Sequence, residues 1–566
     1  MNSPSNSHLS PLRRMLSDIT AEEPDQSMGQ RFPRVNTPTR KVLADALSPL
    51  AQDAVHTPPR ASRRGATICD VLRDRAQADG IRPFMQVWAE GEGVVLTLSF
   101  TEVQVRVDVA AAALRHAGVP RAACVAMLSH STVQCFVYTL AIFAIGGAAA
   151  QLNWRQTDDQ LAAMLGSSDA TALVASARLA QPAHLLASRQ SIALLFLEPP
   201  PFSQDGPSHL LPQLNGDGVP TSASPPSRDT SSPPLPHSRA LVMFTSGSTG
   251  KPKAVPLTHA GLLWTFEQRA RLCPEALAQP NAGTLCFLPN FHVIGLANNF
   301  LFNLYAGIRC VVHRDAGSCA VTAALLVEAC ASVKPTILDT VPSLVEDMLA
   351  LLEAGHASAG CLSRLHHVLA GGSPLSEPRL LPKLDRHGVV LWPHYGQTEV
   401  GGPVLIGGLH GSLRAMRPLP DAEFEMIDER GEVVARDAHG AREGELVWLR
   451  LPCAHHGYLG AERAAAARLA VPGPPRQRLA TGDIFRTRVV SGNEWLEFVC
   501  RKVRPPCGRS PLCAPLCPTA PHCAPLRHAR PTRTRTRPVH PAATRAAPTS
   551  VDPCMCAGRA VAAVDW

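Results

Sequence analysis

The sequence lacks a hydrophobic run long enough to form a membrane-spanning helix. Its longest apolar stretch, residues 136–150, is shorter than the ~20 residues that such a helix needs, and it contains Gly146 and Gly147. We therefore expect a buried core helix in this stretch. A secretory signal is also missing, because the chain opens on Met-Asn-Ser-Pro, with neither a basic start nor an apolar core.

Regular cysteine spacing is missing as well. The 17 cysteines are odd in number and are scattered without a repeating interval, which argues against a disulfide framework. Together with the missing secretory signal, this predicts reduced thiols and an intracellular protein, cytoplasmic or in an organelle. Neither the cysteines nor Ser248 have a convincing base partner in the sequence, so we predict no covalent nucleophile.

Most of the chain has no excess of charge of one sign. The formal net charge is +8, but residues 501–566 hold eleven Lys and Arg against two acidic residues, a charge of +9, so residues 1–500 carry −1. Residues 1–500 therefore have no excess of positive charge to bind nucleic acid, and we expect no nucleic-acid partner. Nucleic-acid binding by the basic tail alone is an alternative, as is a metal site there, although its cysteines fit no standard zinc spacing.

Composition divides the chain into several segments. A length of 566 residues indicates two or more domains. Residues 1–65 are rich in Ser, Pro, Arg and Gln and are expected to be disordered; their acidic residues argue against a transit peptide. Residues 66–500 alternate helix-like and strand-like segments in the manner of an α/β protein, with a Pro/Ser-rich surface linker at 199–237. The Pro/Arg/Cys-rich residues 501–566 cannot bury a core.

Short apolar runs and helical periodicity define the expected elements of the 66–500 core. Strands are expected at residues 125–128, 241–243, 336–338 and 367–370. Helices are expected to begin near residue 67 and to occupy residues 132–145, 320–330 and 343–353. Two of these strands lead into glycine-containing loops, and α/β folds place ligands at the carboxyl ends of their strands.

A run of hydroxyl residues, glycines and lysines follows the expected strand at 241–243. Glycine lets backbone N–H groups turn toward an anion, hydroxyls add donors, and lysine supplies a point charge. The run predicts a phosphate cradle made of Thr245, Ser246, Gly247, Ser248, Thr249, Gly250, Lys251 and Lys253. It is not a Walker A loop, because Thr245 stands where the first glycine should fall and Pro252 follows Lys251. A shorter run of this kind would be typical of a flexible connector.

Three further motifs follow the cradle along the chain. They are Ala370-Gly-Gly-Ser-Pro-Leu375, Tyr395-Gly-Gln-Thr-Glu399 and Thr481-Gly-Asp483. In this order the four motifs resemble the phosphate, adenine-side, Tyr-Gly-x-Thr-Glu and ribose-binding motifs of the adenylate-forming superfamily, which includes acyl-CoA synthetases, luciferases and peptide-synthetase adenylation domains. The resemblance covers about residues 66–502 and extends to the segments 152–155 and 288–295.

The resemblance implies an α/β fold, namely the large N-terminal domain of an adenylate-forming enzyme, with stacked α/β sheets and a small β-subdomain. It implies an AMP-forming acyl-CoA synthetase, in which a carboxylic acid attacks the α-phosphate of ATP to give acyl-AMP, and CoA then accepts the acyl group. ATP, CoA and a small-molecule acid are the expected partners, and Mg²⁺ is the expected metal. A medium- or long-chain fatty acid is the first candidate substrate, and an aryl acid is the alternative. The oligomeric state does not follow from the sequence.

The same resemblance assigns residues to the phosphates and the metal. The cradle residues would wrap the β- and γ-phosphates, with Lys253 among the catalytic residues. Thr398 would hydrogen-bond the α-phosphate, and Glu399 would hold Mg²⁺, since a hard cation prefers carboxylate oxygen. Outside this motif, a Thr-Glu pair is more often a helix cap or an exposed face.

The nucleoside side of the expected site comes from the other motifs. Asp483 would accept hydrogen bonds from both ribose hydroxyls, and Tyr395 would offer a flat face to adenine. The remaining residues expected to bind the nucleotide are Gly371, Gly372, Ser373, Gly396, Gln397 and Arg501. His292 is either a wall of the acyl pocket or a core histidine.

The resemblance ends shortly after Asp483. Arg501 matches the arginine of the family's hinge, but Cys500 stands for the hinge glycine and Val503 for its aspartate. The proline-rich tail then replaces the small mobile lid domain and its catalytic lysine. The tail resembles GC-rich sequence read in a wrong frame, so an erroneous gene model or retained intron is the first explanation and a true truncated isoform the second. Two functional alternatives stay open: a carboxylate-adenylating domain that serves a carrier protein, and a non-catalytic ATP-binding isoform.

Overall fold

The chain divides after Lys502 into two units, and every residue that the structure describes belongs to the first. The expected disordered segment 1–65 and residues 503–566 of the expected tail lie outside the described residues. The computed structural model describes residues 66–199, 208–212, 234–245, 252–316, 320–356, 362, 365–407, 412–449, 451–453, 457–460, 478–490 and 493–502.

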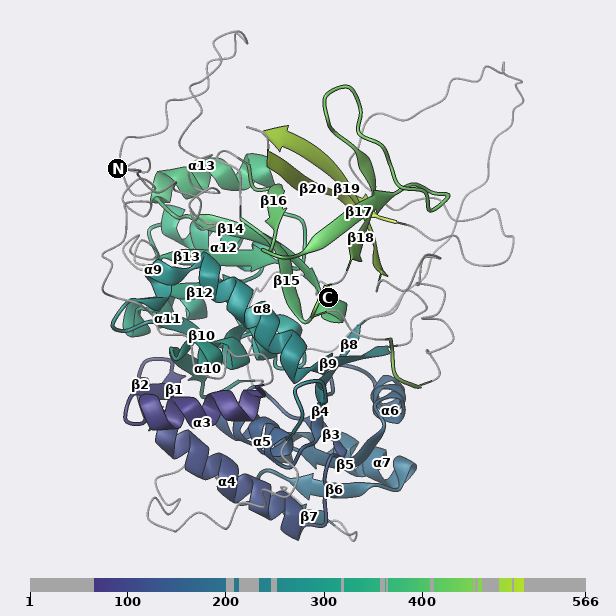
Figure 1. Cartoon of the computed structure of the whole chain (residues 1–566). Helices are drawn as coiled ribbons and strands as arrows, with labels where there is room; N and C mark the ends of the chain where they lie inside the picture. The colour runs from purple at the N-terminus through teal and green to yellow at the C-terminus, as the bar shows by residue number, and fades with distance from the viewer. Residues whose placement is uncertain are drawn as a thin grey trace, which may run out of the picture. The chain divides into compact units, whose positions relative to one another are not determined.

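In the described residues, seven strands form the smaller sheet, in the order β7-β6-β5-β3-β4-β8-β9 (Figure 1). All neighbours are parallel except β8 and β9. The central strand β3 is buried along its whole length, as expected for a parallel strand covered on both faces. The bounds are β3 Cys124–Leu128, β4 Ala148–Gln151, β5 Ala170–Ala175, β6 Ala193–Phe196, β7 Ser208–Leu210, β8 Arg239–Thr245 and β9 Lys253–Thr258.

The larger sheet has 13 strands in the described part of the chain, in the order β17-β18-β19-β20-β16-β15-β14-β13-β12-β10-β11-β1-β2 (Figure 1). The run from β14 to β1 is parallel, and the strands from β15 to β17 are antiparallel. The expected small β-subdomain therefore continues directly from the parallel sheet. The bounds are β1 Pro83–Ala89, β2 Gly93–Ser99, β10 Gly283–Leu285, β11 Arg309–His313, β12 Ile337–Thr340, β13 His367–Gly371, β14 Leu391–Gln397, β15 Gly402–Ile406, β16 Ala415–Pro418, β17 Glu423–Ile427, β18 Glu443–Leu449, β19 Arg478–Val490 and β20 Asn493–Arg501.

Side-chain caps fix the starts of the first helices. Thr67 and Asp70 form a capping box at α3, Ser99 and Glu102 form another at α4, and the Thr132 hydroxyl caps α5. The helices are α3 Ile68–Ala78, α4 Phe100–His116, α5 Val133–Ala144, α6 Asp158–Ser167, α7 Ala180–Gln190, α8 His259–Leu272, α9 Pro274–Leu277, α10 Phe302–Ala306, α11 Ala323–Val333, α12 Pro342–Glu353 and α13 Glu377–His387, with the 3-10 turns η2 Ala177–Leu179 and η5 Thr398–Val400 and the π-helix η3 Ile294–Leu301.

The long apolar stretch of the sequence forms helix α5 and the start of β4. The helix is buried from Val133 to Phe143, which confirms the expected core helix. Among the described residues, no helix combines the length and the apolar character needed to cross a bilayer.

Two expected elements differ from the structure. The helix expected at 320–330 begins at Ala323, because the Thr322 hydroxyl accepts a hydrogen bond from Leu325 N and caps it there. The expected surface linker at 199–237 contains β7, which adds a parallel edge strand to β6. Composition favoured a linker, but tertiary pairing with β6 and burial of Leu211 outweigh it at these residues.

A buried polar network joins the loop after β10 to the smaller sheet. Asn290 donates its backbone N–H to Ser131 Oγ at 2.9 Å and its side-chain Nδ2 to Gln151 Oε1 at 3.0 Å. Gln151 in turn donates to Thr139 Oγ1 at 3.2 Å. Because these polar groups are buried and bonded to one another, they hold the loop in one position relative to β3 and β4.

Three buried histidines predict that the fold is sensitive to acid. Burial lowers the pKa of His259 to about 4 and the pKa of His367 and His394 to about 3. The unfolded chain takes up these protons near its ordinary pKa of 6.5, so stability that is present above pH 6.5 is lost as the pH falls toward 3. At pH 5 each histidine costs about 2 kcal/mol.

Urea unfolding at pH 7 and pH 5 measures this cost. His259→Phe should lessen the difference between the two pH values, whereas His116→Phe, at an exposed position on α4, should leave it unchanged. A free energy of unfolding that is the same at both pH values would contradict the prediction.

Candidate active site

The two ends of the expected phosphate cradle lie opposite each other. Thr245 ends β8, Lys253 begins β9, and the antiparallel register pairs these two residues. A strand follows the cradle instead of a helix, which agrees with the exclusion of a Walker A loop. The other predicted cradle residues lie outside the described residues: Ser246, Gly247, Ser248, Thr249, Gly250 and Lys251.

Asp483 is a buried carboxylate on β19, with 2% of its surface exposed. Its Oδ2 accepts hydrogen bonds from the Tyr395 hydroxyl at 2.6 Å and from Gln397 Nε2 at 2.9 Å. The exposed guanidinium of Arg501 lies 3.6 Å from the other oxygen, Oδ1. Burial raises the pKa of Asp483, although the hydrogen bonds and the guanidinium act to lower it. The Asp483 carboxylate is therefore oriented by three other residues of the predicted nucleotide site, namely Tyr395, Gln397 and Arg501.

The segment that carries Tyr395 approaches Asp483 through a close contact between strands. A Cβ on Gly396 would overlap the carbonyl oxygen of Gly402 on β15, so only glycine permits this packing. The Tyr395 ring meets Phe485 edge-on, with 4.9 Å between centroids. Burial and the Asp483 carboxylate raise the pKa of Tyr395, so its hydroxyl keeps its proton and serves as a donor. Its adenine contact stays a prediction.

Thr398 and Glu399 lie in η5, directly after β14. The Tyr458 hydroxyl donates to Glu399 Oε1 at 2.7 Å, and Lys253 Nζ lies 5.2 Å from the centroid of the Tyr458 ring. The Glu399 charge also acts to raise the pKa of Asp483. The structure thus brings residues from the cradle, the Tyr-Gly-x-Thr-Glu segment and the Thr-Gly-Asp motif into one region.

The expected adenine-side loop lies at the end of β13. Gly371 pairs with His394 of β14, and a Cβ on Gly371 would overlap the His394 ring. Gly372 has φ 87°, a left-handed conformation that favours glycine, and Ser373 is exposed. The chain therefore turns sharply here, next to the strand that carries Tyr395.

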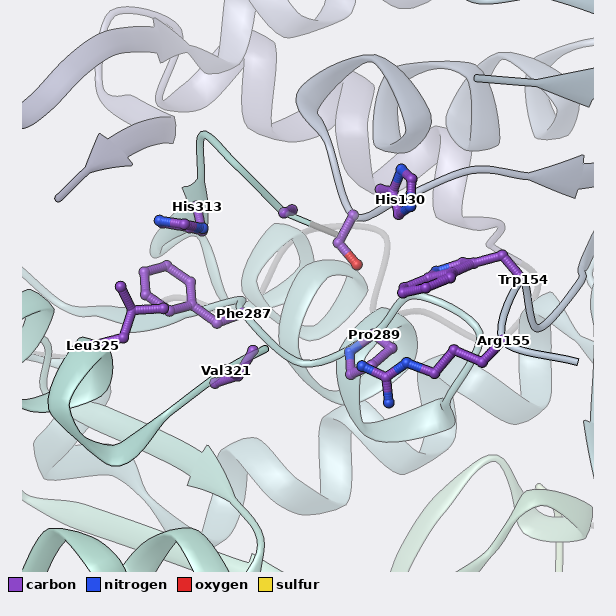
Figure 2. Close-up of a pocket in the computed structure, with 10 residues that line it drawn as sticks. His130, Trp154, Arg155, Phe287, Pro289, His313, Val321 and Leu325 are labelled. Carbon is purple, nitrogen blue, oxygen red and sulfur yellow. The ribbon is translucent and has the colours of Figure 1, made fainter. Parts of the chain in front are cut away.

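A hollow of about 30 Å³ lies at the carboxyl ends of strands from both sheets (Figure 2). His130 follows β3 and Trp154 follows β4, while Phe287 follows β10 and His313 ends β11. In Figure 2, Phe287 and His313 lie on one side of the hollow, and His130 and Trp154 lie on the other. Carboxyl ends of parallel strands are the usual ligand positions in such folds. The hollow is lined by His130, Ser131, Trp154, Arg155, Phe287, Pro289, His313, Ala316, Val321 and Leu325.

Arg155 is an exposed cation at this hollow. Its guanidinium lies over two rings, 5.1 Å from the centroid of Trp154 and 5.8 Å from that of Phe291. No carboxylate pairs with it in the part of the chain that the structure describes. A guanidinium held on aromatic faces and without an acidic partner is suited to an anionic group of a ligand.

His292 lies beside Phe291, with 4.7 Å between ring centroids, and is not among the residues that line the hollow. Burial, aided by the charge of Arg155, lowers the pKa of His292 to about 4, so the imidazole is neutral at pH 7. These contacts fit a core histidine as well as a pocket wall, and both interpretations of His292 stay open.

The residues around Glu399 fit a Mg²⁺ ion that arrives with phosphate. The described residues contain no group of three or more His, Cys, Asp or Glu arranged to hold a metal by themselves. Mg²⁺ is commonly bound by one or two carboxylates together with substrate phosphates and water. A single carboxylate, Glu399, close to the ends of the cradle is therefore a suitable donor set.

Three residues of the two candidate regions were not expected from the sequence to take part in a site. Tyr458 contacts both Lys253 and Glu399, but its Gly-Tyr pair offers no distinctive spacing. Trp154 and Arg155 were noted only as part of a resembling segment, and an aromatic-cation pair directly after a buried strand was the available signal for a ligand contact.

The order of motifs and the sheet topology together define an adenylate-forming fold. The profile of the AMP-binding enzyme family matches residues 73–459, more than half of the chain, and the chain therefore belongs to that family. The predicted resemblance and the predicted α/β fold class are confirmed.

Curated relatives match part of the chain. It is 29% identical over 305 residues to indoleacetate–CoA ligase of Aromatoleum aromaticum, covering 53% of this chain and 55% of the relative. It is 28% identical over 392 residues to the acyl-CoA ligase AFT1-1 of Alternaria alternata, covering 66% of this chain and 64% of the relative. The chain thus spans between half and two thirds of the length of these relatives.

Solved structures share the fold. A protein described as a long-chain-fatty-acid CoA ligase of Rhodopseudomonas palustris superposes with a TM-score of 0.61 at 19% identity, over 77% of this chain and 100% of that one. At this identity the similarity establishes the architecture alone.

Proposed function

We propose that this protein activates a carboxylic acid with ATP, forming acyl-AMP and pyrophosphate, and transfers the acyl group to the thiol of CoA. One observation carries the proposal: the described residues of three separate motifs meet in one region, where Asp483 is held by Tyr395 and Gln397 and Tyr458 links Glu399 with Lys253. Family membership supports the nucleotide assignment.

The proposed reaction has two displacements. In the first, a carboxylate oxygen of the acid bonds to the α-phosphorus of ATP, and the bond to the pyrophosphate oxygen breaks. In the second, the CoA sulfur bonds to the acyl carbon, AMP leaves, and the thiol proton passes to solvent. The second displacement follows because AMP is a much better leaving group than the oxygen of a free carboxylate.

Hydrogen-bond donors and cations of the site would stabilise the negative charge that develops in the first displacement. Negative charge builds on the α-phosphoryl oxygens and on the departing pyrophosphate, so positioned donors and cations lower the barrier. The Thr398 hydroxyl would donate to the α-phosphate, and the Lys253 ammonium would pair with phosphate oxygens. Glu399 would hold Mg²⁺, which would supply additional positive charge to the phosphates. Asp483 would fix the ribose through its oxygens.

For the acid, a medium- or long-chain fatty acid is our first candidate and an aryl acid is the second. The hollow does not discriminate between the two acids, because its volume of about 30 Å³ is close to that of a single water molecule. Trp154 and Phe287 line it with aromatic rings. One relative is named for indoleacetate, an aryl acid, and the other is named only as an acyl-CoA ligase.

Incubation of the full chain with ATP, Mg²⁺, CoA and single acids tests the proposal. The panel holds hexanoate, palmitate, an arylacetate and a cinnamate, and AMP, pyrophosphate and thioester are measured. The same assay is run on a chimera that joins residue 500 to the lid of a relative, because we expect the tail at 501–566 to replace the lid domain. We expect acid-dependent AMP release, with much more thioester from the chimera.

Each alternative predicts a different result. ATP binding without acid-dependent AMP release from the chain or the chimera would overturn the proposal in favour of a non-catalytic nucleotide-binding protein. Acyl transfer to a phosphopantetheine-bearing carrier protein in preference to CoA would replace the proposed acceptor. Equal thioester formation by chain and chimera would overturn our interpretation of the tail.

A further inference from the structure

Tyr458 contacts one candidate residue from each sheet. Its hydroxyl donates to Glu399 Oε1 at 2.7 Å, and Glu399 follows β14 of the larger sheet. Its ring faces Lys253 Nζ, 5.2 Å from the ring centroid, and Lys253 begins β9 of the smaller sheet. A single side chain thus lies between the expected metal ligand and the expected phosphate ligand.

The position of Tyr458 is fixed by its surroundings. The side chain is 5% exposed and belongs to the main hydrophobic core cluster. The next residue, Leu459, donates its backbone N–H to the carbonyl oxygen of Ala254 at 2.9 Å, one residue after Lys253. Burial and backbone pairing to β9 leave the phenol little freedom to turn away from Glu399.

The phenol contacts two groups of opposite charge, the Lys253 ammonium and the Glu399 carboxylate. A lysine and a glutamate at the same site would pair with each other, and each would then have to give up its partner before it bound phosphate or metal. No ion pair joins Lys253 to Glu399 in the described residues. Instead, the Tyr458 ring faces the ammonium and its hydroxyl donates to the carboxylate.

We propose that Tyr458 is a positioning residue of the nucleotide site: its hydroxyl orients Glu399 for a divalent cation, and its ring holds Lys253 toward phosphate. This inference rests on the proposed function, because both ligands belong to the proposed ATP site. A hydrogen bond from a second residue to a ligating carboxylate commonly changes metal affinity 10- to 100-fold. A ring under an ammonium has a smaller effect, of about two- to fivefold.

Two substitutions separate the two roles. Tyr458→Phe removes only the hydroxyl, and Tyr458→Leu removes the ring as well. Calorimetry measures ATP affinity of the full chain with Mg²⁺ and with EDTA, and the ratio of the two affinities is the gain from magnesium. We expect Tyr458→Phe to lower this gain about tenfold or more. Tyr458→Leu should show the same loss and, in addition, a two- to fivefold loss with EDTA.

Two further variants complete the design. Tyr138→Phe is the matched control, since its hydroxyl bonds the carbonyl oxygen of Pro212 at 3.2 Å and it should keep the full gain. In the double variant Glu399→Gln/Tyr458→Phe, the gain should be no lower than in Glu399→Gln alone, because the hydroxyl acts through that carboxylate. Thermal melting of each variant verifies that the fold is kept.

The outcomes distinguish this inference from the proposed function. Wild-type chain that binds no ATP overturns the proposed function. If the wild-type chain shows a clear gain from magnesium and Tyr458→Phe shows an equal gain, the positioning role of Tyr458 is overturned. The proposed function then stands. The positioning role is also overturned if the losses of gain in Tyr458→Phe and in Glu399→Gln multiply in the double variant. That result would mean that Tyr458 and Glu399 act separately.

Discussion

Glu399→Gln is expected to lower adenylation about a hundredfold or more while the fold is kept. The substitution removes one negative charge from the proposed Mg²⁺ ligand and changes its volume little. The cation would then be held less well at the phosphates, where charge builds during the displacement, and loss of such stabilisation costs a few kcal/mol. Pyrophosphate exchange in the lid-bearing chimera measures the rate, and thermal melting measures the fold.

A matched variant makes the result specific to Glu399. Glu429→Gln makes the same chemical change at an exposed position after β17, and it should retain the wild-type exchange rate. Wild-type exchange in Glu399→Gln would remove this residue from the mechanism. A large drop in melting temperature would instead indicate that the charge of Glu399 serves mainly to stabilise the fold.

Asp483→Ala should weaken ATP binding by about tenfold or more. Hydrogen bonds to a charged group are worth about 1.5–3 kcal/mol each, and the substitution removes the carboxylate that is expected to accept them from the ribose hydroxyls. The variant also leaves the buried Tyr395 hydroxyl and the Gln397 amide without their shared acceptor, so we expect some loss of stability. Asp483→Asn, which keeps one carbonyl oxygen, should lose less on both counts.

Calorimetry with Mg-ATP measures this affinity. A second variant of the site and a control variant are measured in the same way. Lys253→Ala, on the phosphate side of the site, should also bind ATP clearly less well. Glu443→Ala, which removes an exposed carboxylate paired with Arg486 on the neighbouring strand, should bind ATP as the wild type does. Unchanged affinity in both Asp483→Ala and Lys253→Ala would contradict the assignment of the site.

Many helices and strands of the fold could be predicted from short segments of the sequence. The helices near residue 67 and at 132–145 were predictable from apolar periodicity, and the structure adds that the Thr67 and Thr132 hydroxyls cap them. The strands at 125–128 and 367–370 were readable because short apolar runs must be buried. The four motifs were recognisable because phosphate and ribose binding require particular residue types in short segments. Side-chain roles within them stay predictions, since no ligand contact tests them.

The tertiary structure alone decided which distant residues meet. Tyr458 reaches Glu399 across 59 positions of sequence, and Tyr395 reaches Asp483 across 88. β7 forms within a segment whose composition favoured a linker, because an edge of the sheet was available to it. The hollow between Trp154 and Phe287 exists because the carboxyl ends of strands from two sheets face each other. Such contacts depend on strand order and on the packing of one sheet against another, and neither is encoded in the propensities of neighbouring residues.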